Sequence, residues 1–369
     1  MAAGTIRNPQ SEIRNPKSEI RDHTIRHFAL HHIGPVELRV ISDIEAGVIA
    51  LTEVEEEVLR RYSSQPGWPH RVVSLFVLSD MSPLQRQLTR TAKLPPGGVA
   101  ALAYRPVVNV YDLADSTACH IFINETAMIK EGYWDDRLAE TALLAHEHGH
   151  PLAENATVRA SRELTLTLGL SYEKPLSTPD EDAWQDKLRR LLQVLTDKLT
   201  LYAPREIFTN DLVLRSEFTD ALYHLDMINV RNAARAVQSR PVLVAGLMAE
   251  PALTETGRAA FLALADLKAH LDLTLEIASF RRMGRDALAV NLEQVLEREV
   301  FPHLVPETAP AYRAVGELYR SLTSDMAPDD MAGFAGQVVA VLADALKPYG
   351  VALEANIVGR ARSGDRPER

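Results

Sequence analysis

Residues 135–151 read DDRLAETALLAHEHGHP, and this stretch decides how the rest of the chain is interpreted. Its two leading aspartates are typical of a helix start, because a short acidic side chain accepts hydrogen bonds from the first main-chain amides of a helix. Apolar residues then recur at three- and four-residue spacing, at Leu138, Ala139, Ala142 and Leu143. The spacing predicts an amphipathic helix whose apolar stripe continues into His146 and His150.

His146, Glu147 and His150 form the pattern HExxH, which is uncommon by chance in a chain with 12 histidines. Residues four apart lie one turn apart on the same helix face, so two imidazoles can bind one ion. Zn²⁺ accepts imidazole nitrogen and prefers four ligands, of which catalytic sites keep one for water. A carboxylate at Glu147 can accept a proton from that water and later deliver it to a leaving amine. The pattern therefore indicates metal-assisted hydrolysis.

The motif resembles that of the HExxH zinc metallopeptidases, or zincins, and the resemblance covers about residues 97–217. It implies that His146 and His150 bind zinc and that Glu147 is the catalytic base. It also implies an α+β fold in which a small mixed sheet packs on the motif helix, with the edge of the preceding strand, residues 118–124, aligning the substrate.

Two features depart from the family pattern. His148 occupies a position that is usually apolar in zincins. Pro151 follows His150 directly, and the residue before a proline is pushed away from helical backbone. We therefore expect the helix to end at its own second ligand.

A catalytic zinc site needs a third protein ligand. The residues after His150 lack the glycine and third histidine of the metzincins, so the resemblance points to a downstream glutamate, as in the gluzincin branch. Glu206 is favoured because Asn210 follows it by four residues, as in several gluzincin-like families. On a helix Asn210 would share its face and could orient a metal ligand. The alternatives are Glu217, Glu163 and Glu154.

Each of these assignments has a simpler reading. A carboxylate in a first helical turn, such as Glu206, is favoured by the helix dipole alone. The motif could be the solvated end of a histidine-rich helix. Tyr223 and His224 follow on a later helix and could stabilise the transition state, although a tyrosine at helical spacing is more often a core residue.

Upstream of the motif the pattern mixes strand and helix. Short β-branched runs predict strands at residues 36–41, 72–78, 99–110 and 118–124, and residues 44–62 predict a helix with an acidic face. Almost every periodic segment beyond residue 133 predicts a helix. The fold class is therefore α+β, a small mixed sheet on the motif helix followed by an all-helical region.

Several helix ends carry recognisable signals. Thr178, Pro179 and Glu181 predict a helix start with a capping box, and Pro204 predicts the opening of a further helix. Gly284 is expected to close one helix, and Pro348 with Gly350 the last.

The domain organisation follows from these segments. Residues 1–26 contain a seven-residue repeat with a proline in each copy, which predicts a disordered extension instead of a coiled coil. We expect a zincin-like catalytic domain over residues 27–228, a helical domain over 229–358 and a flexible tail over 359–369.

Composition narrows the class of protein. The chain has 40 lysines and arginines against 50 aspartates and glutamates, and this acidic balance argues against a nucleic-acid partner. No apolar run approaches the roughly 20 residues that span a bilayer, and a single cysteine, Cys119, cannot form an internal disulfide. A cytoplasmic location without membrane contact is expected. Cys119 is expected to be a small buried residue, and His31 and His32 to be structural or exposed.

Together these features predict a zinc-dependent peptidase with Zn²⁺ as its cofactor and a peptide or protein as its substrate. They leave the cleavage preference and the oligomeric state open. The alternative is a catalytically silent zincin-fold interaction or sensor protein whose helical C-terminal region binds a partner.

Overall fold

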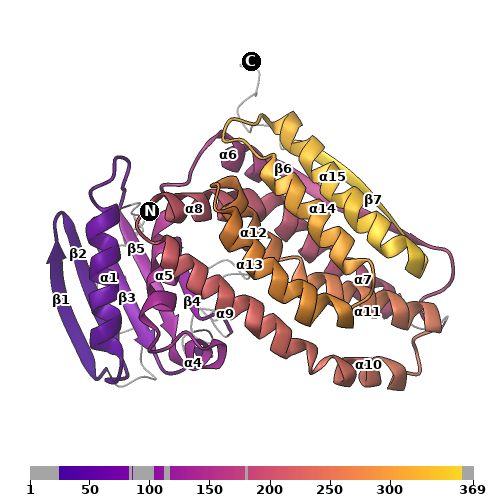
Figure 1. Cartoon of the computed structure of the whole chain (residues 1–369), viewed down its shortest axis with the longest axis horizontal. Helices are drawn as coiled ribbons and strands as arrows, with labels where there is room; N and C mark the ends of the chain where they lie inside the picture. Colours follow the sequence, from indigo (N-terminus) through magenta and orange to yellow (C-terminus); the bar gives the residue numbers. More distant parts are fainter. Residues whose placement is uncertain (1–24, 83–84, 86–103, 112–116, 179–181, 360–369) are drawn as a thin grey trace, which may run out of the picture. The chain divides into compact units, whose positions relative to one another are not determined.

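The structure, a computed structural model, describes residues 25–82, 85, 104–111, 117–178 and 182–359. The chain divides into two compact units, Met1–His148 and Gly149–Arg369. The first unit contains a mixed sheet with helices, and the second is mainly helical (Figure 1). The fold is therefore α+β, as the sequence predicts. Within the described residues no helix combines the length and apolarity needed to cross a membrane.

The elements of the first unit are, in chain order, β1 (His27–Ile33), β2 (Val36–Ser42), α1 (Val48–Tyr62), β3 (Val72–Leu78), β4 (Val107–Tyr111), β5 (Ala118–Asn124), α4 (Glu125–Glu131) and α5 (Arg137–Gly149), the last of which carries the HExxH motif. 

The second unit begins with α6 (Ala156–Arg162), β6 (Leu164–Tyr172), α7 (Asp182–Asp197), the π-helix η3 (Lys198–Tyr202), α8 (Ala203–Arg215), α9 (Thr219–Val237), α10 (Arg240–Ala249) and α11 (Glu255–His270). It continues with α12 (Leu273–Arg282), α13 (Asp286–Val295), the π-helix η4 (Leu296–Val300), the 3₁₀ helix η5 (Phe301–His303), α14 (Thr308–Arg320), α15 (Pro328–Leu346), the 3₁₀ helix η6 (Lys347–Tyr349) and β7 (Val351–Gly359).

The first unit is built on a five-stranded sheet in the order β1-β2-β3-β5-β4. β2, β3 and β5 are parallel, whereas β1 and β4 run antiparallel to their neighbours. On one face of the sheet the three parallel strands are fully buried, and Val40, Leu75 and Ile121 are paired across it. α1 packs against β1 and β2. Its buried side chains recur at three- and four-residue spacing, as burial of one helix face requires.

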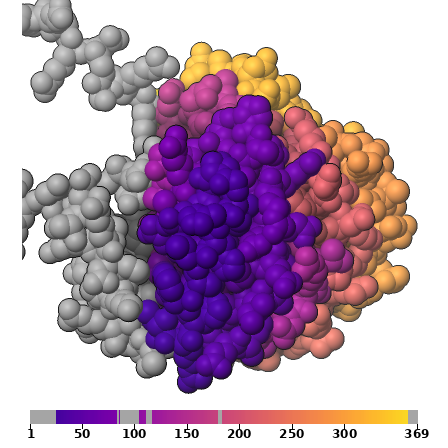
Figure 2. Space-filling model, turned by 90° about the vertical axis from the view of Figure 1, so that its left-hand side faces the viewer, coloured from indigo at the N-terminus to yellow at the C-terminus, as the bar shows by residue number. Residues whose placement is uncertain are grey.

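The other face of the sheet is more open where the described residues form it. Phe76 and Phe122 stack there with their ring centroids 4.8 Å apart. Further along the same register, Phe28 on β1 is 61% exposed. Figure 2 views the chain from the side of β1 and β2, whose indigo atoms form the front of this unit.

The predicted strands at residues 36–41, 72–78 and 118–124 are confirmed as β2, β3 and β5. The helix predicted at 44–62 is confirmed from Val48 onward. Of the strand predicted at 99–110, β4 covers the end, and residues 99–103 lie outside the described part of the chain.

The prediction that the edge of residues 118–124 aligns a substrate is wrong for this sheet. β5 lies between β3 and β4, and it is β4 that ends the order of described strands. The five residues of β4 show too little alternation of apolar and polar side chains to mark where this strand begins. The sequence therefore did not show that β4 is the outer strand and β5 an inner one.

The expectation that almost everything beyond residue 133 is helical fails at β6 and β7. These two strands form an antiparallel pair in full register, from Leu164 opposite Gly359 to Tyr172 opposite Val351. The alternation in LTLTLGLSY is the signal for β6. β7 follows directly on the turn at Gly350, which does close the preceding helical segment as expected.

Other helix ends are as predicted. Pro204 lies in the first turn of α8, and Gly284 has a positive φ of 68° just after α12. The capping box predicted at Thr178 rests on residues 179–181, which lie outside the described residues, as do 1–24 of the predicted extension and 360–369 of the predicted tail.

The compact units divide the chain elsewhere than the predicted domains do. The boundary expected between residues 228 and 229 lies inside α9, a continuous helix of the second unit. The units divide instead between His148 and Gly149, within the motif.

Within the second unit, Arg282 of α12 joins three helices. Its guanidinium donates to the carboxylate of Asp211 on α8, with a shortest distance of 2.9 Å. It also donates to three main-chain carbonyls at the end of α14, those of Tyr319, Arg320 and Leu322. Only 11% of the arginine side chain is exposed. Because the last carbonyls of a helix have no helical donor, Arg282 pairs a buried charge and caps α14 at once.

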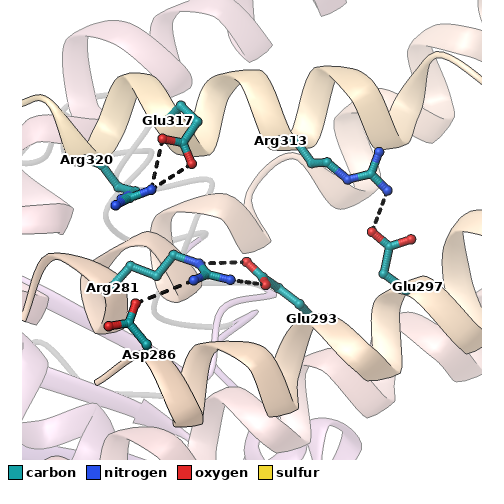
Figure 3. Close-up of polar contacts among 7 residues, drawn as sticks. All are labelled: Arg281, Asp286, Glu293, Glu297, Arg313, Glu317 and Arg320. Carbon is teal, nitrogen blue, oxygen red and sulfur yellow. Dashed lines mark hydrogen bonds and ion pairs between the residues drawn. The ribbon is translucent and has the colours of Figure 1, made fainter. Parts of the chain in front are cut away.

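A second arginine-rich region of this unit is closer to solvent. Figure 3 shows ion pairs around a hollow of about 310 Å³ that is lined by α12, α13, η4 and α14. The pairs are Arg281 with Glu293 and with Asp286, Arg313 with Glu297, and Arg320 with Glu317. Solvent-exposed pairs, such as Arg313 with Glu297, add about 1 kcal/mol or less to stability.

The two regions give a matched test of stability. Replacing Arg282 by Met leaves the Asp211 charge buried without its partner, so we expect the free energy of unfolding to fall by about 3 to 5 kcal/mol. The same change at Arg313, whose side chain is 57% exposed, should cost about 1 kcal/mol or less. Urea unfolding of both variants measures the difference, and equal losses would contradict the assignment of Arg282 as an anchor.

Candidate metal centre

The motif helix α5 begins as the sequence predicts. The carboxylate of Asp136 accepts hydrogen bonds from the main-chain amides of Leu138 and Ala139, both at 3.1 Å. Ala139 and Ala142 are buried, but Leu138 is 44% exposed, so the buried face is rotated from the predicted stripe. That rotation leaves His146 and Glu147 half-buried, at the border between core and surface.

The three motif side chains lie close enough together to form a candidate metal site. One possible ligand atom from each of His146, Glu147 and His150 lies within 4.8 Å of the other two. His150 is 7% exposed, and the other two are half-buried. The described residues contain no other cluster of three or more histidine, cysteine or acidic side chains with this spacing. One turn of helix is therefore enough to bring the predicted pair of imidazoles together.

The helix ends at Gly149, and His150 lies in the turn that follows, as Pro151 predicts. Gly149 is closely packed against Thr209 of α8. A Cβ at this position would lie 3.0 Å from Cγ2 of Thr209, and real Cβ contacts are rarely so short. At the second variable position of the motif, a side chain larger than that of glycine would therefore press on α8.

Thr209 also determines which nitrogen of His150 carries a proton. Nδ1 of His150 lies 3.0 Å from the hydroxyl oxygen of Thr209. That hydroxyl donates its own proton to the main-chain carbonyl of Arg205, at 2.8 Å. It can therefore only accept from His150, which places the ring proton on Nδ1 and leaves the Nε2 lone pair for a metal.

Glu206 lies near that nitrogen. Its Oε2 is 3.9 Å from Nε2 of His150, and its side chain is about one-third exposed. It occupies the first turn of α8, as predicted, where its charge also interacts favourably with the helix dipole. An acceptor nitrogen and a carboxylate oxygen that face each other repel unless a cation or a proton lies between them.

The alternative third ligands have other surroundings. Glu154 forms an ion pair with Arg162 at 2.9 Å. Glu163 is the residue that ends α6, and Glu217 is exposed between α8 and α9. Of the four glutamates that the sequence offered, Glu206 is therefore the one that the structure brings close to a motif histidine.

His148, which departs from the zincin pattern, is a core residue. Its Nε2 lies 2.7 Å from Oε1 of Glu55 on α1, and both side chains are fully buried. The pair joins the motif helix to α1 inside the first unit. The sequence assigned an acidic face to this helix, but Glu55 belongs to its buried stripe, with Leu51 and Val58. A charged residue in an apolar stripe is a signal of a buried partner.

The remaining predicted residues lie in ordinary surroundings. Asn210 is buried on α8, one turn from Glu206. Tyr223 is half-buried and packs edge-on against Phe280, and His224 follows it on α9. His31 is paired with Glu56 at 2.7 Å, and His32 is exposed on β1. Thr209 was not anticipated, although a threonine three residues after a first-turn glutamate lies close to it on a helix.

Cys119 is buried, as predicted. Burial is the largest of the effects that raise the pKa of its thiol well above the ordinary value, and Glu55 and Glu147 add to it. Its sulfur donates to the side-chain oxygen of Asn109 at 3.2 Å.

Comparison of the chain with protein-family models, with curated proteins and with solved structures found no match.

The first turn of α5 gives a test of pH dependence. Glu140 is buried and accepts a hydrogen bond from the main-chain amide of Asp135. Burial raises its pKa to about 7, although that hydrogen bond opposes the shift. The carboxyl group of Glu140 therefore holds its proton more tightly in the folded chain than in the unfolded chain, where glutamates have a pKa of about 4.3. The stability contribution of Glu140 is full below about pH 4 and is lost as the pH rises to about 7.

Replacing Glu140 by Gln removes this ionisation. We expect the variant to gain about 1 to 2 kcal/mol over the unmodified protein above pH 7, after allowance for solvent screening, and nothing below pH 4. Thermal unfolding at a series of pH values measures the gap. A gap that stays constant from pH 4 to 8 would contradict the raised pKa.

Proposed function

We propose that the protein is a zinc-dependent peptidase of the zincin type, in which His146, His150 and Glu206 bind the metal and Glu147 is the general base. The proposal is carried by one observation, the gathering of the three motif side chains within 4.8 Å of one another. The carboxylate of Glu206 lies 3.9 Å from Nε2 of His150 and is the proposed source of an oxygen ligand beside that imidazole. Two histidines and one glutamate are a common ligand set for catalytic zinc.

The spacing of His150 and Glu206 is compatible with the size of the ion. Ligand atoms about 2.0 to 2.1 Å from a tetrahedral ion are about 3.4 Å apart. The distance of 3.9 Å between Nε2 of His150 and Oε2 of Glu206 exceeds that spacing by about half an ångström, which a side-chain rotation can close. The hydrogen bond from His150 to Thr209 supports the same role, since histidine ligands generally donate their other ring proton to a protein acceptor.

Each residue then has a defined task. When bound, Zn²⁺ supplies Lewis acidity to the scissile carbonyl and lowers the pKa of water toward about 7. Glu147, next to His146 and half-buried, accepts the proton of the attacking water and delivers it to the departing amine nitrogen. Breaking the C–N bond and forming a C–O bond consumes one water and yields a carboxylate and an amine.

The base and the metal ligand can be separated by mutation. Glu147→Gln should keep the zinc content near one ion per chain, because the imidazoles and Glu206 remain, and should lower hydrolysis of casein at least about 100-fold. Glu206→Gln should lose zinc and activity together, whereas Glu217→Gln, at an exposed position, should lose neither. Metal analysis and a chelator-sensitive assay give both readouts. Full activity of Glu147→Gln would exclude the mechanism. Loss of zinc in Glu217→Gln but not in Glu206→Gln would assign the third ligand to Glu217.

The hydrogen bond behind His150 gives a separate test. Thr209→Val keeps the shape of the side chain but removes the acceptor of the ring proton, so zinc affinity should fall about 10- to 100-fold. Thr209→Ser keeps the hydroxyl and should stay within about threefold of the unmodified protein. A competition titration against a zinc chelator measures both, and equal affinities for the two variants would contradict the role of Thr209.

A second function, partner binding without catalysis, is favoured by α10 of the helical unit. This helix buries none of its residues, and Val242 and Met248 are 75% and 61% exposed. Exposed apolar surface of this kind often marks an interaction site. Zinc bound at full occupancy without turnover of casein would favour this alternative over the peptidase.

A further inference from the structure

The main-chain carbonyl of Glu147 has an unusual position in α5. In a helix this oxygen would accept from the amide four residues later, and that residue is Pro151, which has no N–H. The helix also ends at Gly149, so this carbonyl belongs to its last turn. Glu147, the residue considered as the general base, therefore has a proline at the position whose N–H would donate to its carbonyl in a helix.

A side chain from the sheet donates to this carbonyl. Nδ2 of Asn109, in the middle of β4, donates to the carbonyl oxygen of Glu147 at 3.1 Å. β4 is the last strand in the described order of the sheet, and Asn109 is paired with Ile121 of β5. The contact spans 38 residues of sequence, and it ties the outer strand to the end of the motif helix.

The orientation of the amide is set from its other side. Sγ of Cys119 lies 3.2 Å from Oδ1 of Asn109. Burial raises the pKa of this thiol, so it stays protonated and can act as the donor. The oxygen and the nitrogen of a side-chain amide point in different directions. When the thiol donates to the oxygen of Asn109, the nitrogen of the same amide is therefore left to donate to Glu147.

We propose that Asn109 is a positioning residue for hydrolysis. Its amide donates to the carbonyl of Glu147 in place of the N–H that Pro151 lacks, and so holds Glu147 in a fixed position relative to the paired imidazoles. The inference rests on the proposed peptidase function. It explains why a helix that stops between its two metal ligands keeps its last turn in shape. It also assigns a use to Cys119, since the thiol holds the amide in the donating orientation.

The test exploits the proline. Asn109→Leu keeps the approximate shape but removes the donor, and Pro151→Ala returns a main-chain N–H to the position four residues after Glu147. With zinc-loaded full-length protein and casein as substrate, we expect Asn109→Leu to lower kcat about 10- to 100-fold while KM changes less than threefold. In the Pro151→Ala background the same change should lower kcat less than about threefold. The rescue is the readout that a general loss of structure would not give.

Two results would overturn the proposal: an unchanged kcat for Asn109→Leu, or an equal loss in both backgrounds. If Asn109→Leu does not fold, the thiol provides the second comparison. Cys119→Ala should lower kcat and Cys119→Ser, which keeps a donor, should restore most of it; equal rates for these two variants would likewise overturn the orientation of the amide.

Failure of the peptidase function is recognised separately. If the unmodified protein binds zinc but cleaves no casein, the peptidase proposal fails and the contact is judged on unfolding free energies measured by urea titration. Rescue of the Asn109→Leu loss by Pro151→Ala then supports the replacement of the helical donor, and equal losses with and without Pro151 overturn it.

Discussion

The hydrogen bond between His150 and Thr209 is the contact on which the candidate site depends. Thr209 gives its own proton to the carbonyl of Arg205 and so can only accept from the imidazole. This single constraint directs the Nε2 lone pair of His150 toward the carboxylate of Glu206. Without it the neutral ring could carry its proton on Nε2, and that nitrogen would then have no lone pair to offer a metal.

The motif helix ends inside the motif, and neighbouring elements contact the residues around its C-terminal end. Pro151 removes a donor, Gly149 admits α8 to the main chain, and Asn109 supplies a hydrogen bond from β4. His148, inside the same five residues, is used for packing with Glu55 and not for the metal. Adjacent side chains of one turn thus belong to the candidate site and to the core alternately, because successive side chains on a helix point about 100° apart.

Local signals in the sequence were sufficient for much of the fold. Alternation and β-branching identified β2, β3 and β5, and proline and glycine identified several helix ends. Pairing over long distances was not accessible in the same way. β7 pairs with β6 across more than 170 residues, and the order of β4 and β5 depends on register that no local pattern records. The residues of the candidate site show the same difference between local and long-range contacts. One-turn spacing predicted the gathering of His146, Glu147 and His150, whereas Thr209, Glu55 and Asn109 act across 38 to 93 residues.

The coordination of zinc in solution tests the central claim most directly. X-ray absorption at the zinc edge, recorded on full-length protein loaded with one equivalent of Zn²⁺, reports the atoms bound to the ion. The account predicts two imidazole nitrogens at about 2.0 to 2.1 Å with oxygen completing the shell, and the loss of one oxygen ligand or of the ion itself in Glu206→Gln. A shell without imidazole, or one that is unchanged when His146 and His150 are both replaced by alanine, would contradict it.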